Sequence, residues 1–323
     1  TIAGALAEQA TQTILGTALP VVDSQDTLGE LCGSSFMKQK FAGNDTVTDY
    51  KDWNTQFEGV AGETSAEAFL RRLIREASEL AASGSNPAGA PSYVSAAGID
   101  YQQYVEKFLL GALVFAQGSD DYLDDDAATP GKGLLASAGQ AEGKPYSGLE
   151  HVWDEGFGYF GAARAYDDRD DATNRSGVVD DNNDGFIDVR SEHNFGASTN
   201  AAKRDQGADP SAPTNFTAAA FEAFLEGRTI ISRTGLDLAA MSADDRATLV
   251  AARDRAVSAW EQAIAATVVH YINDVLDDMA AIGTAEYSLA DHAKHWAEMK
   301  GFALGLQFNP NSPILATDTT ATP

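Results

Sequence analysis

The residues that point most directly to chemistry are oxygen-bearing side chains spaced two apart between positions 180 and 188. This segment reads D-x-N-x-D-G-F-I-D. Oxygen ligands at positions one, three and five of such a loop converge on a calcium ion, and a glycine at position six permits the sharp turn. The pattern therefore predicts a calcium loop. Its predicted ligands are Asp180, Asn182, Asp184, Asp188 and Glu192, together with the carbonyl oxygen of Phe186.

The end of this loop departs from the usual calcium pattern. Position twelve, where a bidentate acid is expected, is Ser191, and the acid follows one residue later at Glu192. No flanking pair of helices is evident from periodicity. The alternative is an ordinary turn rich in Asp and Asn. The calcium interpretation assigns the ion a structural role, with Ile187 anchoring the loop in the core.

Histidine and carboxylate side chains also recur at one-turn spacing on two predicted helices. Residues three or four apart project from the same face of a helix. Facing helices in bundle proteins use such pairs as nitrogen and oxygen ligands for iron, zinc or manganese. The alternative is a set of buried polar groups that hydrogen-bond to one another. The candidate transition-metal ligands are His151, Asp154 and Glu155 on one helix and His292, His295 and Glu298 on the other.

The two helices that carry these histidines share a longer pattern, W-x-E-x-x-G-aromatic. It begins at Trp153 in the first helix and at Trp296 in the second, in a chain with four tryptophans. Chance rarely sets such a quartet twice, so we infer an old duplication that produced two related half-bundles. If both sets of ligands point inward, they are expected to share one metal.

Composition limits the partners of the chain. The 323 residues include 22 Lys and Arg against 48 Asp and Glu, a formal charge of -26. Such a charge repels phosphate backbones and attracts cations, so nucleic-acid binding is excluded and metal ions are favoured. The acidic surface also serves solubility, whatever else it does. The single cysteine, Cys32, allows no internal disulfide or cysteine-based zinc site.

No apolar run is long enough for a membrane-spanning helix, so we expect no transmembrane segment. The chain begins at Thr1 without a basic-then-apolar signal, and we expect an export segment to have been left out.

Helical periodicity dominates the rest of the chain and predicts an all-α fold. Between the helices, residues 118–146 are predicted to form a solvated acidic loop, and residues 167–214 a long insert that metal would order. We predict one compact unit with an N-terminal half-bundle (1–166), the loop-rich insert (167–214) and a C-terminal half-bundle (215–323). The helical pattern over residues 244–282 is longer than an ordinary globular helix, so we expect a break within it. The predicted helices are 65–82, 100–117, 148–166, 216–231, 244–282 and 288–306.

The order of these motifs resembles an uncharacterised family of bacterial envelope lipoproteins allied to the imelysin-like and iron-regulated proteins. The resemblance covers roughly residues 95–315. Imelysin-like proteins carry a G-x-H-x-x-E motif proposed as a metal or peptidase site. The nearest equivalents here are G-x-x-H-x-x-D-E, from Gly148 to Glu155, and the H-x-x-E of His295 and Glu298. The segments that carry the resemblance are 98–107 with Gly111, 150–159, the calcium-like loop with 200–205, Gly227 with Arg228, and 292–306.

The resemblance implies an imelysin-like bundle of two duplicated halves, located in the periplasm or on the outer-membrane surface. It implies uptake or handling of iron or another metal. Fe or Zn is therefore the expected transition metal, in addition to the structural Ca²⁺ predicted from the loop. We therefore expect a cell-envelope metal-binding protein whose partners are metal ions or a metal complex, and an envelope partner protein that the sequence does not identify. Two alternatives stay open: a metallopeptidase that uses the same His and Glu residues, and a calcium-stabilised surface scaffold.

Overall fold

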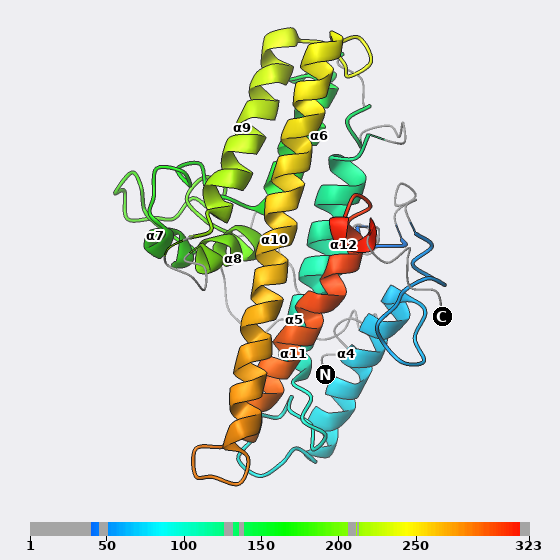
Figure 1. The fold of residues 1–323 in the computed structure, drawn as a ribbon, viewed down its shortest axis with the longest axis vertical. Helices are drawn as coiled ribbons and strands as arrows, with labels where there is room; N and C mark the ends of the chain where they lie inside the picture. The colour runs from blue at the N-terminus through cyan, green and yellow to red at the C-terminus, as the bar shows by residue number, and fades with distance from the viewer. Residues whose placement is uncertain are drawn as a thin grey trace. The chain divides into compact units, whose positions relative to one another are not determined.

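The computed structural model of the chain describes residues 40–44, 51–125, 132–135, 139–205, 211 and 213–316. These residues form helices and no strand, with three isolated antiparallel bridges, so the predicted all-α fold is confirmed (Figure 1). The α-helices are α4 (Ala66–Ser83), α5 (Tyr101–Leu109), α6 (Gly148–Phe160), α7 (Asp171–Arg175), α8 (Gly196–Arg204), α9 (Phe216–Thr234), α10 (Ala243–Ala281), α11 (Leu289–Gly305) and α12 (Pro313–Ala316). Two π-helical segments, η1 (Leu110–Phe115) and η2 (Gln117–Tyr122), follow α5, and a 3₁₀ turn, η3 (Leu306–Phe308), follows α11.

The chain divides into two compact units, and each is described by itself. Unit 1 comprises residues 1–113 and 270–304, and unit 2 comprises residues 114–269 and 305–323. Helix α10 contributes its last turns to unit 1 and its longer part to unit 2. The half-bundle boundaries expected from the sequence, at 166 and 214, stay a prediction.

Unit 1 is built around rings from α4, α5 and the segment before α4. Phe69 packs edge-on against Phe108 at 5.1 Å and against Tyr104 at 5.4 Å between ring centroids, and stacks on Phe57 at 5.7 Å. Tyr104 meets Trp296 of α11 at 5.7 Å with perpendicular rings. Edge-to-face pairs of this kind add to the free energy gained from burying apolar area. The buried faces of α4 and α5 therefore meet in one aromatic cluster.

Unit 2 is held by a second aromatic cluster, in which α6 lies against α9 and α10. Phe160 of α6 contacts Trp260 of α10 at 5.5 Å and Phe224 of α9 at 5.8 Å. Trp153 is 1% exposed, and its indole Nε1 donates a hydrogen bond of 2.9 Å to the carbonyl oxygen of Phe224. Helix α6 begins with a capping box between Ser147 and Glu150 and ends at a left-handed glycine. Residues near the ends of α6 therefore determine where it begins and ends. Contacts with α9 and α10 determine which of its faces is buried.

Helix α10 runs for 39 residues without a break, so the break expected within residues 244–282 is wrong. The segment contains no glycine or proline, the residues that most often kink a helix. Length alone was a poor reason to expect an interruption.

The first part of the predicted acidic loop, residues 118–122, is also helical and buried, which corrects the expectation of a solvated segment. Asp120 is 2% exposed and Asp121 is 1% exposed, in the π-helical turn η2. Trp260 packs directly on Gly118, where an added Cβ would lie 2.6 Å from a ring carbon. The aspartates are inside because α5 continues into π-helical turns beneath this tryptophan. Periodicity of 3.6 residues does not detect such turns.

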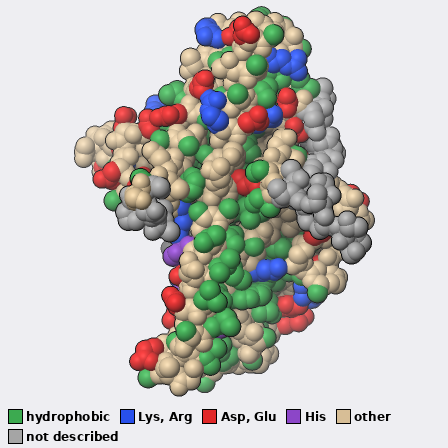
Figure 2. All heavy atoms as spheres, viewed as in Figure 1, with side chains coloured by type: hydrophobic (Ala, Val, Ile, Leu, Met, Phe, Trp, Pro, Cys, Tyr) green, Lys and Arg blue, Asp and Glu red, His purple; other side chains and the backbone are tan. Residues whose placement is uncertain are grey.

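The last turns of α10 leave an apolar stripe exposed in unit 1. Figure 2 shows hydrophobic side chains gathered over the C-terminal end of α10 and over α11. The stripe consists of Ile272, Leu276 and Met279, followed by Ile282, and each is at least 40% exposed. Among the residues described, no helix has the length and apolar character needed to cross a membrane.

A buried carboxylate fixes the start of α9 in unit 2. Asp205 is 4% exposed and accepts hydrogen bonds from the backbone N–H groups of Phe216 and Thr217 and from the Thr217 hydroxyl. These are first-turn donors that no other helix residue satisfies. We expect Asp205→Ala to lower the free energy of unfolding by about 3 kcal/mol, because buried donors lose a charged acceptor.

Denaturant unfolding followed by circular dichroism measures this loss. Asp170→Ala is the matched control, since Asp170 caps α7 from an exposed position through the Thr173 N–H at 2.8 Å. That variant is expected to lose about 1 kcal/mol. Equal losses in the two variants would show that burial of Asp205 contributes nothing.

Candidate functional site

The loop predicted to bind calcium turns sharply at Asn183 and Gly185. Both oxygens of Asp180 accept backbone hydrogen bonds, from Asp184 N–H at 3.1 Å and from Gly185 N–H at 2.8 Å. Asn182 accepts the same Asp184 N–H at 2.9 Å. Asn183 (φ 57°) and Gly185 (φ 83°) are left-handed, and Asn183 is the one non-glycine residue in the described chain with positive φ. Asparagine and glycine tolerate this conformation best. The oxygens at positions one and three are thereby drawn around a common turn.

Two backbone contacts hold the ends of the loop in place within unit 2. An antiparallel bridge pairs Val178 with His193, and the Ser191 carbonyl accepts the Arg164 N–H at 2.8 Å. The second loop residue, Asp181, forms an ion pair with Arg169, which is itself largely buried. Arg169 therefore neutralises the one carboxylate of the segment 180–184 that is not a predicted ligand.

The structure places Glu192, the displaced acid, at the base of the loop. Glu192 is 4% exposed, and its Oε2 accepts the backbone N–H of Asp188 at 2.8 Å. The backbone N–H of Arg190 hydrogen-bonds Asp188 in turn and lowers the pKa of that carboxyl, so Asp188 is held ionised. The expectation that Ile187 anchors the loop in the core is wrong, since Ile187 is 39% exposed and Phe186 is 78% exposed.

The insert around this loop is ordered by buried amide groups. Asn194 Oδ1 accepts the Ala163 N–H at 2.7 Å, and its Nδ2 donates to Asn174 at 3.0 Å. Tyr166 donates to the Ser198 carbonyl at 2.6 Å. Helices α7 and α8 lie within the insert, so the insert is loop-rich but partly helical. The order of the segments flanking the loop therefore comes from these hydrogen bonds.

In the first histidine set, two of the three candidate ligands lie near each other and the third contacts an arginine. His151 stacks on Tyr146 at 5.4 Å between ring centroids, and its Nε2 lies 3.9 Å from Glu155 Oε1. Asp154 instead accepts a hydrogen bond of 2.8 Å from Arg228 Nε. The structure thus brings His151 and Glu155 near each other on the exposed face of α6 and assigns Asp154 to an arginine.

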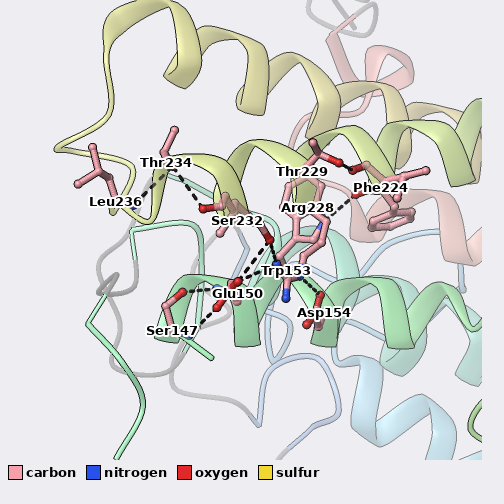
Figure 3. A network of polar contacts seen from close by, with 12 residues as sticks. Ser147, Glu150, Trp153, Asp154, Phe224, Arg228, Thr229, Ser232, Thr234 and Leu236 are labelled. Atoms are coloured by element: carbon pink, nitrogen blue, oxygen red, sulfur yellow. Dashed lines mark hydrogen bonds and ion pairs between the residues drawn. The ribbon is translucent and has the colours of Figure 1, made fainter. Parts of the chain in front are cut away.

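Arg228 organises the contact between α6 and α9. Figure 3 shows its guanidinium between the two helices, directed at Glu150 and Asp154, with Ser232 beside it. The Arg228 Nη1 to Glu150 Oε1 distance is 2.8 Å. The Ser147 backbone N–H and, secondly, Arg228 hold the pKa of Glu150 below its ordinary value. Partial burial raises the pKa of Asp154, although Arg228 opposes that rise.

In the second set, His295 is the best-oriented histidine. Its Nδ1 lies 2.7 Å from Asp278 Oδ2, an arrangement typical of metal-binding histidines because it fixes the ring and leaves Nε2 available. Glu298 is 4% exposed, its Oε2 has no hydrogen-bond partner, and its Oε1 lies 3.8 Å from Lys107 Nζ. His292 instead contacts the Tyr287 hydroxyl at 3.3 Å and lines a cavity of about 430 Å³.

The two sets do not form one described site. His151, Asp154 and Glu155 belong to unit 2, whereas His292, His295 and Glu298 belong to unit 1. In the part of the chain that the structure describes, no group of three or more His, Cys, Asp or Glu side chains is arranged to hold a metal ion. Transition-metal binding by these residues stays a prediction.

The duplicated pattern is also packed differently in its two copies. At Gly301 an added Cβ would lie 2.7 Å from Lys107 Cβ, whereas at the matching Gly158 it would meet nothing within 4 Å. Gly301 therefore permits a close approach between α11 and α5 that has no counterpart at Gly158.

Sequence reasoning missed several polar groups that the structure brings together. Lys132 Nζ lies 3.1 Å from both Gln117 Oε1 and Asp121 Oδ2, and all three residues are buried in unit 2. No sequence pattern indicates this contact, because it joins a π-helical turn to a segment with no helical periodicity. Arg164 and Arg190 lie on opposite sides of the calcium-like loop in the sequence, and only the fold brings them to one pocket.

A family model described as a domain of unknown function, DUF4856, matches residues 41–309. No curated protein and no solved structure matches the chain.

Proposed function

The chain belongs to the DUF4856 family of domains of unknown function, and we propose that it is a calcium-binding protein of the cell envelope. The loop from Asp180 to Glu192 is the proposed site. The single observation that carries the proposal is the left-handed backbone at Asn183 and Gly185, which turns the Asp180 carboxylate toward the middle of the loop. The side chains offered there are carboxylates and an amide, the hard oxygen donors that calcium prefers.

The loop favours calcium over smaller or softer ions. Magnesium requires near-ideal octahedral geometry at short distances, whereas calcium accepts six to eight oxygens in a flexible arrangement. Nitrogen and sulfur ligands, which select transition metals, are absent from residues 180–192. Asp180 and Asp184 would hold the ion, together with Asn182 and the Phe186 carbonyl oxygen. The Asp188 side chain would have to move toward the ion, because no three carboxylates of the described residues are arranged around one point. Glu192 would hold the backbone of Asp188 in place by accepting a hydrogen bond from the Asp188 backbone N–H.

The expected affinity is low and suits a compartment with abundant calcium. Ser191 replaces the bidentate acid at position twelve, and residues 181–190 are all exposed. Fewer charged ligands weaken a calcium loop toward dissociation constants of about 10⁻⁴ to 10⁻³ M, the range of extracellular modules. This is the physical support for a location outside the cytosol, in the periplasm or on the outer surface. A role like that of the imelysin-like proteins would also place this protein in the periplasm or on the outer surface.

Isothermal titration calorimetry with calcium tests the proposal. We expect one site per chain in the wild type and no site in the double variant Asp180→Asn/Asp184→Asn. Asp181→Asn is the matched control, because Asp181 has the same charge and pairs with Arg169 outside the predicted ligand set. Equal binding by the control and the double variant would assign calcium to another part of the chain.

A second candidate function, binding of a transition metal, is favoured by one observation in unit 1. His295 is oriented by Asp278, and one oxygen of the buried Glu298 has no hydrogen-bond partner. We propose that His295 Nε2 and Glu298 take up zinc or iron(II), with the remaining positions open to solvent or to a peptide. The ammonium group of Lys107 would compete with a metal ion for Glu298, since it lies 3.8 Å from Glu298 Oε1.

Zinc titration separates this candidate from the calcium site. His295→Ala should abolish zinc uptake and leave calcium binding unchanged, whereas His270→Ala, on an exposed part of α10, serves as the control. Cleavage of insulin chain that requires zinc and is lost in Glu298→Ala would convert this candidate into the metallopeptidase alternative. Zinc binding that survives in His295→Ala would reject it.

A further inference from the structure

Unit 2 contains a cavity whose lining combines aromatic rings with arginines. It lies between α6, α9 and the segments that flank the calcium-like loop, and it has a volume of about 380 Å³. That volume is within the range of pockets for small organic ligands. The rings that line it are Trp153, Phe157, Phe221 and Phe224.

The charge in this cavity is opposite in sign to that of the chain. Arg164, Arg190 and Arg228 line it, against the single carboxylate of Asp154. Because Arg228 already pairs with Asp154 and Glu150, its charge is compensated. The charge of the other two arginines therefore determines the potential at the cavity mouth.

Arg164 and Arg190 differ in this respect from Arg228, the third arginine of the cavity. Neither guanidinium has an ion-pair or hydrogen-bond partner among the described residues. Five of the ten arginines of the unit are paired with carboxylates, namely Arg169, Arg228, Arg233, Arg253 and Arg255. The backbone N–H of Arg190 and the Ser191 hydroxyl lower the pKa of Asp188, and the charges of Arg190 and Arg164 lower it further, so Asp188 is an anion that competes for them. Asp188 is itself occupied by the Arg190 N–H and the Ser191 hydroxyl.

The floor of the cavity is apolar and rigid. Trp153 is held by its hydrogen bond to the Phe224 carbonyl, and the two rings meet edge-on at 6.0 Å (Figure 3). Phe157 meets Phe221 at 5.9 Å and Phe224 at 5.4 Å. A flat apolar group placed here gains aromatic contacts without moving the walls.

We propose that this cavity binds a small organic acid that has a flat apolar body and a terminal carboxylate. The body packs on Phe157 and Phe221, and the carboxylate lies between Arg164 and Arg190. Guanidinium groups match carboxylates through paired, charge-assisted hydrogen bonds, which makes arginine the suitable residue for this role. Neither guanidinium is a predicted calcium ligand, so the acid is expected to bind with and without calcium, although both arginines act electrostatically on Asp188.

The test uses 3-phenylpropionate as the ligand and its neutral analogue, 3-phenylpropanamide, as the comparison. Binding is followed at the indole N–H of Trp153 by NMR, with the signal assigned through Trp153→Phe. We expect the acid to shift this signal and to bind at least tenfold more tightly than the amide. Hydrogen bonds to charged groups are strong enough for such a ratio. Measurements with calcium and with a chelator separate this site from the loop.

Arg164→Gln and Arg190→Gln are each expected to weaken binding of the acid about tenfold and to leave binding of the amide unchanged. Both residues are exposed and unpaired, so the fold should persist, and unchanged melting temperatures check this. Arg246→Gln is the matched control: it removes the same charge from an exposed position on α10, outside the cavity. Equal binding of acid and amide, an unmoved Trp153 signal, or equal losses in the control would each overturn the proposal.

Discussion

Calcium is expected to raise the melting temperature of this protein by roughly 3 to 10 °C at 10 mM. With a dissociation constant of about 10⁻⁴ to 10⁻³ M, that concentration stabilises the folded state by about 1.4 to 2.7 kcal/mol. The conversion assumes about 2 to 4 °C per kcal/mol for a unit of this size. The free loop places Asp180 and Asp184 close together without an arginine partner, and a bound cation would relieve their repulsion. Differential scanning calorimetry with and without chelator measures the shift.

Three comparisons make this result specific to the loop. Asp180→Asn/Asp184→Asn should melt at the same temperature with and without calcium, because its two principal charged ligands are gone. Asp181→Asn should keep the full shift, since Asp181 is bound to Arg169. Magnesium at the same concentration controls for general screening of the acidic surface. A shift of equal size with magnesium, or one that persists in the double variant, contradicts the assignment.

Gly227→Ala is expected to lower the free energy of unfolding by about 3 kcal/mol, at the upper end for an overpacked core. A Cβ at this position would lie 2.0 Å from Trp153 Cζ2, so α9 and α6 would have to move apart. The tryptophan has no room to move, because it is buried and hydrogen-bonded to Phe224. Since the same contact forms the floor of the cavity, the variant should also lose binding of 3-phenylpropionate. Denaturant unfolding measures the change in the free energy of unfolding.

The control for Gly227→Ala lies on the facing helix. Gly158 is also a helical glycine, but an added Cβ there meets nothing within 4 Å. Gly158→Ala should therefore stabilise the protein by about 0.5 to 1 kcal/mol, the difference in helix propensity. A Gly227→Ala variant as stable as the wild type would show that α6 and α9 are not packed this closely.

The helices were largely predictable from the sequence because each carries its own local signals. Ser65, Ser147 and Asn215 cap the starts of α4, α6 and α9, and left-handed glycines end the same three helices. The calcium-like loop was predictable for a similar reason, since Gly185 and the alternating oxygens specify a turn within a few residues. A local structure that is determined by residues close in sequence can therefore be predicted from the residue pattern.

The errors concern residues whose surroundings come from distant segments. The burial of Asp120 and Asp121 depends on π-helical turns beneath Trp260, which no local pattern indicates. The metal-ligand role of Asp154 stays a prediction, but spacing alone did not indicate its contact with Arg228, 74 residues away. The exposed Ile187 shows the same limit, because an apolar side chain is buried only if some other element covers it.

The most direct test of the central claim is the behaviour of the Gly185 amide when calcium is added. Its N–H donates to Asp180 Oδ2 at 2.8 Å, so a cation bound by that carboxylate must change the amide's chemical shift. In a protein labelled with ¹⁵N-glycine, we predict that the Gly185 signal moves in a saturable way, and that it stays fixed in Asp180→Asn/Asp184→Asn. A Gly185 signal that does not move at 10 mM calcium would contradict the proposal that this loop binds the ion.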